Sequence, residues 1–202
     1  MASTATPYGL RAVNELGGLP YAGSTRTFLI NPAGYNTNIF NGSIVAVNTA
    51  GYLEIVTTVG STSSDVFPAG VVGVFVGCSF VNAQGQLMFS QYYPANTTGV
   101  VQAFVIDDDR TVFQVQAAGS LAQTALGMNA ILNAVQSTST GSTQNGNSNT
   151  ALSTSVAATA TYAFKIVGFV QGPFSTVGDA YTDVLVKFNV GSHAYNTALG
   201  VA

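Results

Sequence analysis

Charged side chains are scarce in this chain. Only 6% of its 202 residues are Asp, Glu, Lys or Arg, whereas a soluble globular domain usually carries about 25%. At the same time 47% of the residues are hydrophobic. Because charge normally keeps a free protein surface wet and non-adhesive, we expect this chain to bury surface in a membrane, in a fibre or against copies of a partner.

Long apolar runs are missing too, which argues against a membrane. The apolar runs are short and interrupted by glycine, as in residues 70–77 (GVVGVFVG). None approaches the roughly 20 apolar residues of a spanning helix. The first eleven residues have no basic n-region and no apolar h-region, so we expect neither a secretory signal nor a membrane partner.

Residues that carry chemistry are few. Cys78 is the only cysteine and His193 the only histidine, so the chain cannot supply the four ligands of a structural zinc site. Cys78 is typical of a small buried hydrophobe, and His193, close to Tyr195, of a surface or interface residue. No G-x-S-x-G motif occurs. We therefore expect no catalysis, no metal and no cofactor, and the five dispersed basic residues argue against a nucleic-acid partner.

The dominant period of the apolar residues is two, which indicates strands. Poor helix signals around Gly127 favour a loop that leads into a strand near Met128–Val135. Ile44–Val47 and Tyr52–Val56 are predicted to form a hairpin with a four-residue turn that ends in Gly51. Further strands are predicted at Val71–Val81, Val100–Ile106, Thr111–Ala117, Tyr162–Val170 and Val184–Val190.

Short strands at regular spacing predict an all-β fold, an antiparallel β-barrel or sandwich. Residues 39–202 are expected to form a single β domain. Residues 1–38, rich in Gly, Pro, Ser and Thr, are expected to form an extended N-terminal arm. Residues 137–155 are a long polar loop of low complexity, with too little apolar area to offset the entropy of its own ordering.

One cluster of charge stands out, Asp107-Asp108-Asp109-Arg110. Clustered carboxylates suit hard cations such as Ca²⁺. The favoured interpretation is a solvated hairpin tip, because strand patterns flank the four residues directly and Asp is common in turns.

Several segments resemble the small head decoration, or cement, proteins of tailed bacteriophages. The resemblance rests on composition and phrases over most of the chain, without a catalytic motif. The segments are TPYGLR (6–11), GGLPYAGSTR (17–26), GVFVGCSF (73–80), FSQYYPA (89–95), VIDDDRTVFQVQA (105–117) and GDAYTDVLVKFN (178–189) followed by His193-Ala194-Tyr195.

This resemblance implies a structural protein on the outer capsid surface of a virion, in contact with the major capsid protein and assembled as a homotrimer. It would stabilise the shell by bridging capsid subunits. Another phage structural subunit, of tail, fibre or shell, is the alternative, and a carbohydrate-binding β-sandwich module a more distant one. The residues expected to make capsid or subunit contacts are Pro7, Tyr8, Leu10, Arg11, Tyr21, Arg26, Tyr92 and Tyr93.

Overall fold

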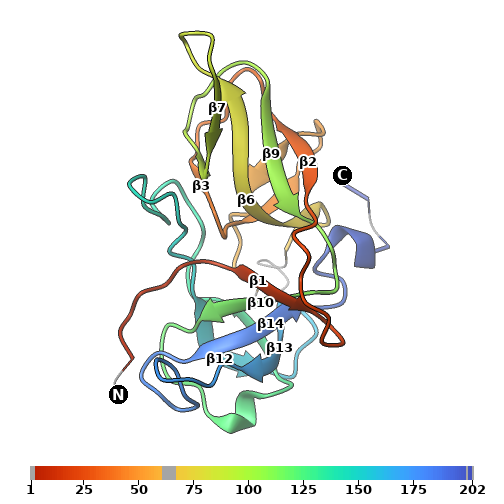
Figure 1. Cartoon of the computed structure of the whole chain (residues 1–202). Helices are drawn as coiled ribbons and strands as arrows, with labels where there is room; N and C mark the ends of the chain where they lie inside the picture. Colours follow the sequence, from red (N-terminus) through yellow and green to blue (C-terminus); the bar gives the residue numbers. More distant parts are fainter. Residues whose placement is uncertain (1–2, 61–66, 199, 202) are drawn as a thin grey trace.

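The protein is all-β and consists of two main sheets, one above the other in Figure 1. The computed structural model describes residues 3–60, 67–198 and 200–201. The lower sheet is antiparallel throughout, with strand order β1-β10-β14-β13-β11-β12. Its strands are β1 (Arg11–Glu15), β10 (Thr111–Gln116), β11 (Asn129–Leu132), β12 (Leu152–Ala157), β13 (Phe164–Phe169) and β14 (Asp183–Phe188).

The upper sheet closes into a five-stranded barrel. The strand order is β4-β5-β2-β9-β6, and a further pairing between β4 and β6 closes the ring; β7 extends the sheet beyond β6. The barrel is mixed, because β2 and β5 run parallel and the other pairs antiparallel. Its strands are β2 (Arg26–Ile30), β4 (Ile44–Val47), β5 (Leu53–Ile55), β6 (Val71–Val81), β7 (Leu87–Ser90) and β9 (Val101–Ile106).

A small two-stranded sheet accompanies the barrel. It pairs β3 (Ile39–Phe40) with β8 (Tyr92–Tyr93). Among the described residues, the helical content is confined to two short 3₁₀ turns, η1 (Gln123–Ala125) and η2 (Ala194–Asn196).

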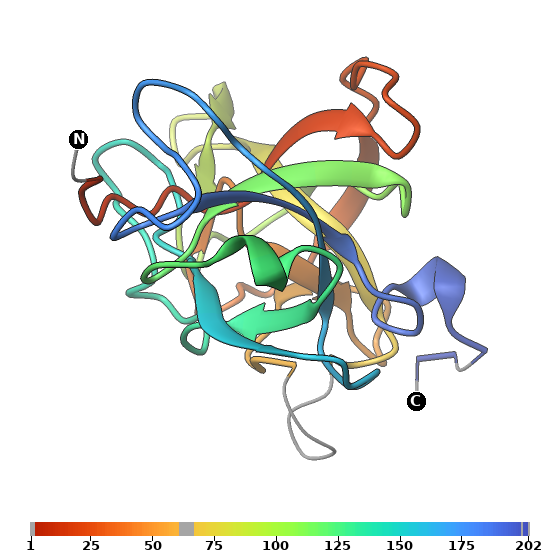
Figure 2. The ribbon, with the colours of Figure 1, turned by 90° about the horizontal axis from the view of Figure 1, so that it is seen from below.

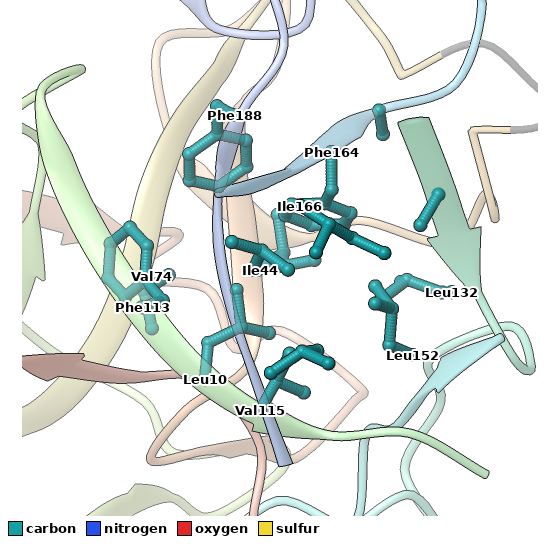
Figure 3. Close-up of a cluster of buried hydrophobic side chains, with 14 of the residues drawn as sticks. Leu10, Ile44, Val74, Phe113, Val115, Leu132, Leu152, Phe164, Ile166 and Phe188 are labelled. Atoms are coloured by element: carbon teal, nitrogen blue, oxygen red, sulfur yellow. The ribbon is translucent and has the colours of Figure 1, made fainter. Parts of the chain in front are cut away.

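Strands β4 and β6 are buried on both faces, which explains their nearly continuous apolar sequences. Val45 and Phe75 point into the barrel. Ile44 and Val74 face the other way and pack among lower-sheet residues such as Phe113 (Figure 3). Successive side chains of a strand point to opposite faces, so one strand contributes to both cores. Strands β4 and β6 therefore lie between the two hydrophobic cores and join the two sheets.

Gly73 makes a close backbone approach possible inside β6. A Cβ atom at this position would lie 1.9 Å from the carbonyl oxygen of Ile106, and the residue has φ = 144°. A side chain cannot fit against that backbone, so only glycine lets β6 cross the end of β9 here.

The predicted all-β fold and strand positions are confirmed, including the loop that leads into β11. The hairpin prediction for Asp107–Arg110 is wrong. Although β9 and β10 are consecutive in sequence, β9 belongs to the barrel and β10 to the lower sheet. Asp107 is only 8% exposed. The segment connects two sheets, and the local strand pattern carries no information about which sheet a strand joins.

The structure does not confirm the extended N-terminal arm. Within residues 1–38, β1 pairs with β10 at the edge of the lower sheet. β2 pairs with both β5 and β9 and is one of the strands that form the barrel. Only residues 3–10 run outside a strand before β1 begins. The scattered apolar residues of this region belong to strands that are short and half-exposed, which weakens the period-two signal.

The polar segment 137–155 is not a free loop either. Its backbone pairs with Asn41: the amide of Asn41 donates to the carbonyl of Gly146 at 2.9 Å, and the amide of Ser148 donates to the carbonyl of Asn41 at 2.9 Å. Ser148 is fully buried and Thr150 is 5% exposed. Their hydroxyl groups lie 2.7 Å apart. Hydrogen bonds thus hold a segment that has little apolar area.

Candidate contact surfaces

The N-terminal segment, residues 3–10, lies across the lower sheet and is held by polar contacts. The amide of Thr6 donates to Oε1 of Gln116 at 2.8 Å, and Nε2 of Gln116 donates to the carbonyl of Thr4 at 3.2 Å. The amide of Tyr181 donates to Oγ of Ser3 at 2.7 Å. Residues 4–6 remain exposed. The segment therefore presents an ordered, uncharged backbone to the outside.

Tyr8 joins this segment to the sheet through a small polar cluster. Its hydroxyl group donates to Oδ1 of Asp183 at 3.1 Å, and the guanidinium carbon of Arg11 lies 4.6 Å from the centre of the Tyr8 ring. Burial, and then the Asp183 carboxylate, raise the pKa of Tyr8. Burial also raises the pKa of Asp183, although hydrogen bonds from Tyr8 and Gln114 oppose that change. Tyr8 stays protonated and acts as a donor that fixes the segment.

Exposed apolar side chains follow directly in the chain. Val13 on β1 is 44% exposed, and Leu16 and Leu19 in the following turn are 45% and 65% exposed. The turn is closed by a hydrogen bond of 2.7 Å from the amide of Glu15 to the carbonyl of Leu19. We call Arg11, Val13, Leu16 and Leu19 the N-terminal surface. It combines a cation with large apolar groups on a fixed backbone.

Two of the predicted contact residues are corrected by the structure. Leu10 is 2% exposed and belongs to the core between the sheets, and Tyr93 is fully buried in the barrel. The hydroxyl group of Tyr93 donates within the chain, to the carbonyl groups of Tyr35 and Thr97. Neither side chain has surface to offer a partner, because each fills a core position in its own chain.

The other predicted contact residues do not form one surface. Pro7 is half-buried and lines a shallow pocket with Ala5 and Tyr181. Tyr92 is half-buried against Phe40, with ring centres 5.7 Å apart. Tyr21 packs at the margin of the core between the sheets.

Arg26 belongs to a cluster that fixes the C-terminal segment. Its Nε lies 2.8 Å from Oδ2 of Asp107, and the hydroxyl group of Tyr195 donates to the same oxygen at 2.8 Å. The guanidinium carbon of Arg26 is 5.5 Å from the centre of the Tyr195 ring. The carboxylate of Asp107 therefore has a structural role, as the acceptor that ties η2 to the end of β9.

His193 is buried, which corrects the expectation that it lies at the surface. It is 1% exposed. Its Nε2 donates to the carbonyl of Val72 at 3.0 Å, and Nδ1 accepts from the amide of Tyr195 at 3.2 Å. Burial lowers the pKa of the imidazole. Because both nitrogens are engaged within the protein, His193 holds the C-terminal turn against the barrel.

Cys78 lies in the barrel core, as expected from the sequence, and is 1% exposed. Burial raises the pKa of its thiol to about 12. The thiol is therefore inert towards oxidants and metal ions at neutral pH.

The outer wall of the barrel carries a second exposed apolar surface. The pairing register places Phe89, Ser79, Gln102 and Leu29 in one row across β7, β6, β9 and β2, and pairs Leu87 with Val81. Ser79, in the middle of this row, is only 7% exposed, whereas the apolar side chains around it are largely exposed. Their exposed fractions are 48% for Leu29, 55% for Val81, 62% for Leu87, 72% for Phe89 and 67% for Val100, which lies next to the start of β9.

We call these five apolar residues the barrel face. The alternate residues of β6 and β9, such as Cys78 and Ala103, fill the barrel core, whereas Met88, the alternate residue of β7, is 42% exposed. The strand pattern of the sequence does not reveal this surface. The available signal was the absence of any charged residue from position 66 to position 106. Whether the apolar side chains of a strand face a core or solvent depends on what packs against each face, which the local sequence does not specify.

No group of three His, Cys, Asp or Glu side chains that could hold a metal ion occurs within residues 3–60, 67–198 and 200–201. Over the same ranges, no helix has the length and apolar character needed to cross a membrane. Comparison with family models, curated proteins and solved structures gives no match to this chain.

Proposed function

We propose that this protein is a structural virion protein that binds the outer surface of a phage capsid and stabilises it by bridging capsid subunits. The structural observation that supports this proposal is the N-terminal surface. It exposes three large apolar side chains and Arg11 beside an uncharged, anchored segment, and neither needs to order on binding. The phage partner comes from the resemblance of segments such as TPYGLR and GGLPYAGSTR, which form most of this region.

The physical requirements of such a protein agree with this surface. Side chains such as Leu16 and Leu19 gain free energy when they are removed from water. Surfaces poor in charge avoid the desolvation cost of burying ions. A segment already held by Gln116 and Asp183 loses little conformational entropy on docking. Repetition of a modest contact over a symmetric lattice then adds avidity.

The test is binding of the purified protein to expanded capsids, together with the heat stability of the decorated particles. We expect Leu19→Asp to weaken binding at least tenfold, since it places a charge in the apolar contact. Leu126→Asp is the matched control, because Leu126 is 47% exposed and lies after η1, outside the N-terminal surface. Circular dichroism establishes that both variants are folded.

A truncation that removes residues 1–9 complements the point variant. It stops before Leu10, which the core requires. The proposal fails if the wild-type protein does not bind expanded capsids. It also fails if Leu19→Asp and the truncated protein bind and protect the particles as well as the wild type does.

A further inference from the structure

We propose that the barrel face is a self-association surface, on which the barrel face of a second copy of this chain packs about a two-fold axis. This inference concerns the barrel, on the opposite lobe from the N-terminal surface (Figure 1). It is independent of the capsid proposal and is tested in the absence of capsids.

The arrangement of the exposed side chains is the first reason. A strand with one solvated face normally alternates between apolar and polar residues. Here Leu87 and Phe89 are exposed on β7, and Val81 continues the apolar surface on β6. Their neighbours Phe80 and Cys78 on the opposite face are already packed in the barrel. The outer face thus carries large apolar side chains among the polar residues Ser79, Gln102 and Thr27, and within the described residues these apolar side chains stay exposed.

The neutral chemistry of the barrel face favours a second copy of this chain as the partner. No charged residue occurs between positions 66 and 106, and the polar residue between Ser79 and Leu29 in the central row is the amide Gln102. A neutral apolar surface is complemented by another neutral apolar surface, since a charged partner would lose hydration without gaining an ion pair. The barrel face itself has this character, and two-fold packing brings it against its own copy.

The exposed apolar area is a substantial part of what a pair needs. A phenylalanine buries on the order of 150–250 Å², and a Leu or Val, worth about 1.5–3 kcal/mol at about 25 cal/mol per Å², on the order of 60–120 Å². At their exposed fractions, the five residues of the barrel face therefore offer on the order of 350 Å² of apolar surface. A stable interface needs about 800 Å² per partner. The apolar residues supply somewhat less than half of this, and Thr27 and Gln102, both exposed beside them on β2 and β9, supply part of the rest.

The surface is also preformed. The turn between β6 and β7 is closed by the side chain of Asn82, whose Oδ1 accepts from the amides of Gln84 at 3.0 Å and Gln86 at 2.9 Å. The amide of Asn82 donates to the carbonyl of Gln86 at 2.9 Å. Phe89 is thus presented on a fixed hairpin, and pairing does not have to order a loop.

Sedimentation velocity over a dilution series tests the proposal. We expect the wild-type protein to sediment as a dimer at tens of micromolar, and Phe89→Asp to raise the dissociation constant at least tenfold. The matched control is Phe174→Asp, which alters a phenylalanine that is 84% exposed, more than Phe89, in the segment between β13 and β14. This control is expected to remain dimeric. If Phe89→Asp does not fold, Val100→Asp, just outside β9, replaces it with the same expectation.

Three results would overturn the proposal. The first is a wild-type protein that sediments as a monomer at tens of micromolar. The second is an assembly, such as the homotrimer expected from the resemblance, that survives both Phe89→Asp and Val100→Asp. The third is equal dissociation by Phe174→Asp. None of these results depends on whether Leu19→Asp binds capsids.

Discussion

Gln136 is the side chain whose loss should cost this fold most among its buried polar groups. It is 1% exposed. Its Oε1 accepts from the amide of Ile44 at 2.9 Å and from Oγ1 of Thr150 at 3.3 Å. Its Nε2 donates to the carbonyl groups of Ile44 at 3.2 Å and Val56 at 2.8 Å. One amide thus connects β4, the end of β5 and the polar segment 137–155.

Gln136→Leu removes these four hydrogen bonds and nearly preserves the volume. The carbonyl of Ile44 keeps a second donor, the amide of Val56, at 3.0 Å. The buried amide of Ile44 loses its acceptor, Oε1 of Gln136, and the buried carbonyl of Val56 loses its donor, Nε2 of Gln136. An unsatisfied buried group costs about 1–3 kcal/mol, so we expect the free energy of unfolding to fall by about 2–5 kcal/mol. Total stabilities are typically about 5–15 kcal/mol.

Urea unfolding followed by circular dichroism measures this change. The slope rises with chain length, and at about 2–3 kcal/mol per molar urea the midpoint should fall by about 0.7–2.5 M. Gln144→Leu is the control, because Gln144 is exposed in the same polar segment, and exposed substitutions usually stay within about 0.5 kcal/mol. If Gln136→Leu also stays within about 0.5 kcal/mol of the wild type, the reasoning from buried hydrogen bonds is refuted.

Two further predictions concern the core and the C-terminal turn. Gly73→Ala should prevent accumulation of soluble folded protein, because its Cβ would lie 1.9 Å from a backbone oxygen. The control is Gly51→Ala, where φ is 81° and the space is open, and it should lower the free energy of unfolding by only about 1–3 kcal/mol. Equal soluble yields of the two variants would contradict this prediction. Burial lowers the pKa of His193 below its ordinary value of 6.5, so the unfolded chain binds the proton more readily and stability should fall as the pH drops below about 6.5. The fall in Tm between pH 7 and pH 5 should be smaller for His193→Gln than for the wild type, and an identical fall would remove His193 as its cause.

The strands predicted between residues 44 and 190 have local signals, whereas β1 and β2 lie in the expected arm and β12 begins in the expected polar loop, and these three were not predicted. The alternation in Thr111–Gln116 and Asp183–Phe188, and the turn that ends in Gly51, act over a few residues and need no knowledge of the rest of the chain. The same holds for Cys78, whose apolar neighbours make a buried environment the simplest interpretation.

The predicted contact residues show that local sequence signals do not determine which side chains are exposed. Tyr93 and Leu10 were chosen for their residue type and for the expected arm, and both are core residues. Leu29 and Phe89 are apolar strand residues like those of a core, and both are exposed. Composition does not distinguish these cases, because burial depends on what lies opposite each face.

The sequence alone determined that this chain is all-β and poor in charge, since period, turn residues and composition are properties of neighbouring positions. Tertiary structure alone decided that β9 and β10 join different sheets and that β4 and β6 serve two cores. It also placed Gln136 and His193 inside and left the barrel face outside. The physical reason is that each of these outcomes depends on contacts between segments far apart in the chain: Gln136 binds Ile44 and His193 binds Val72.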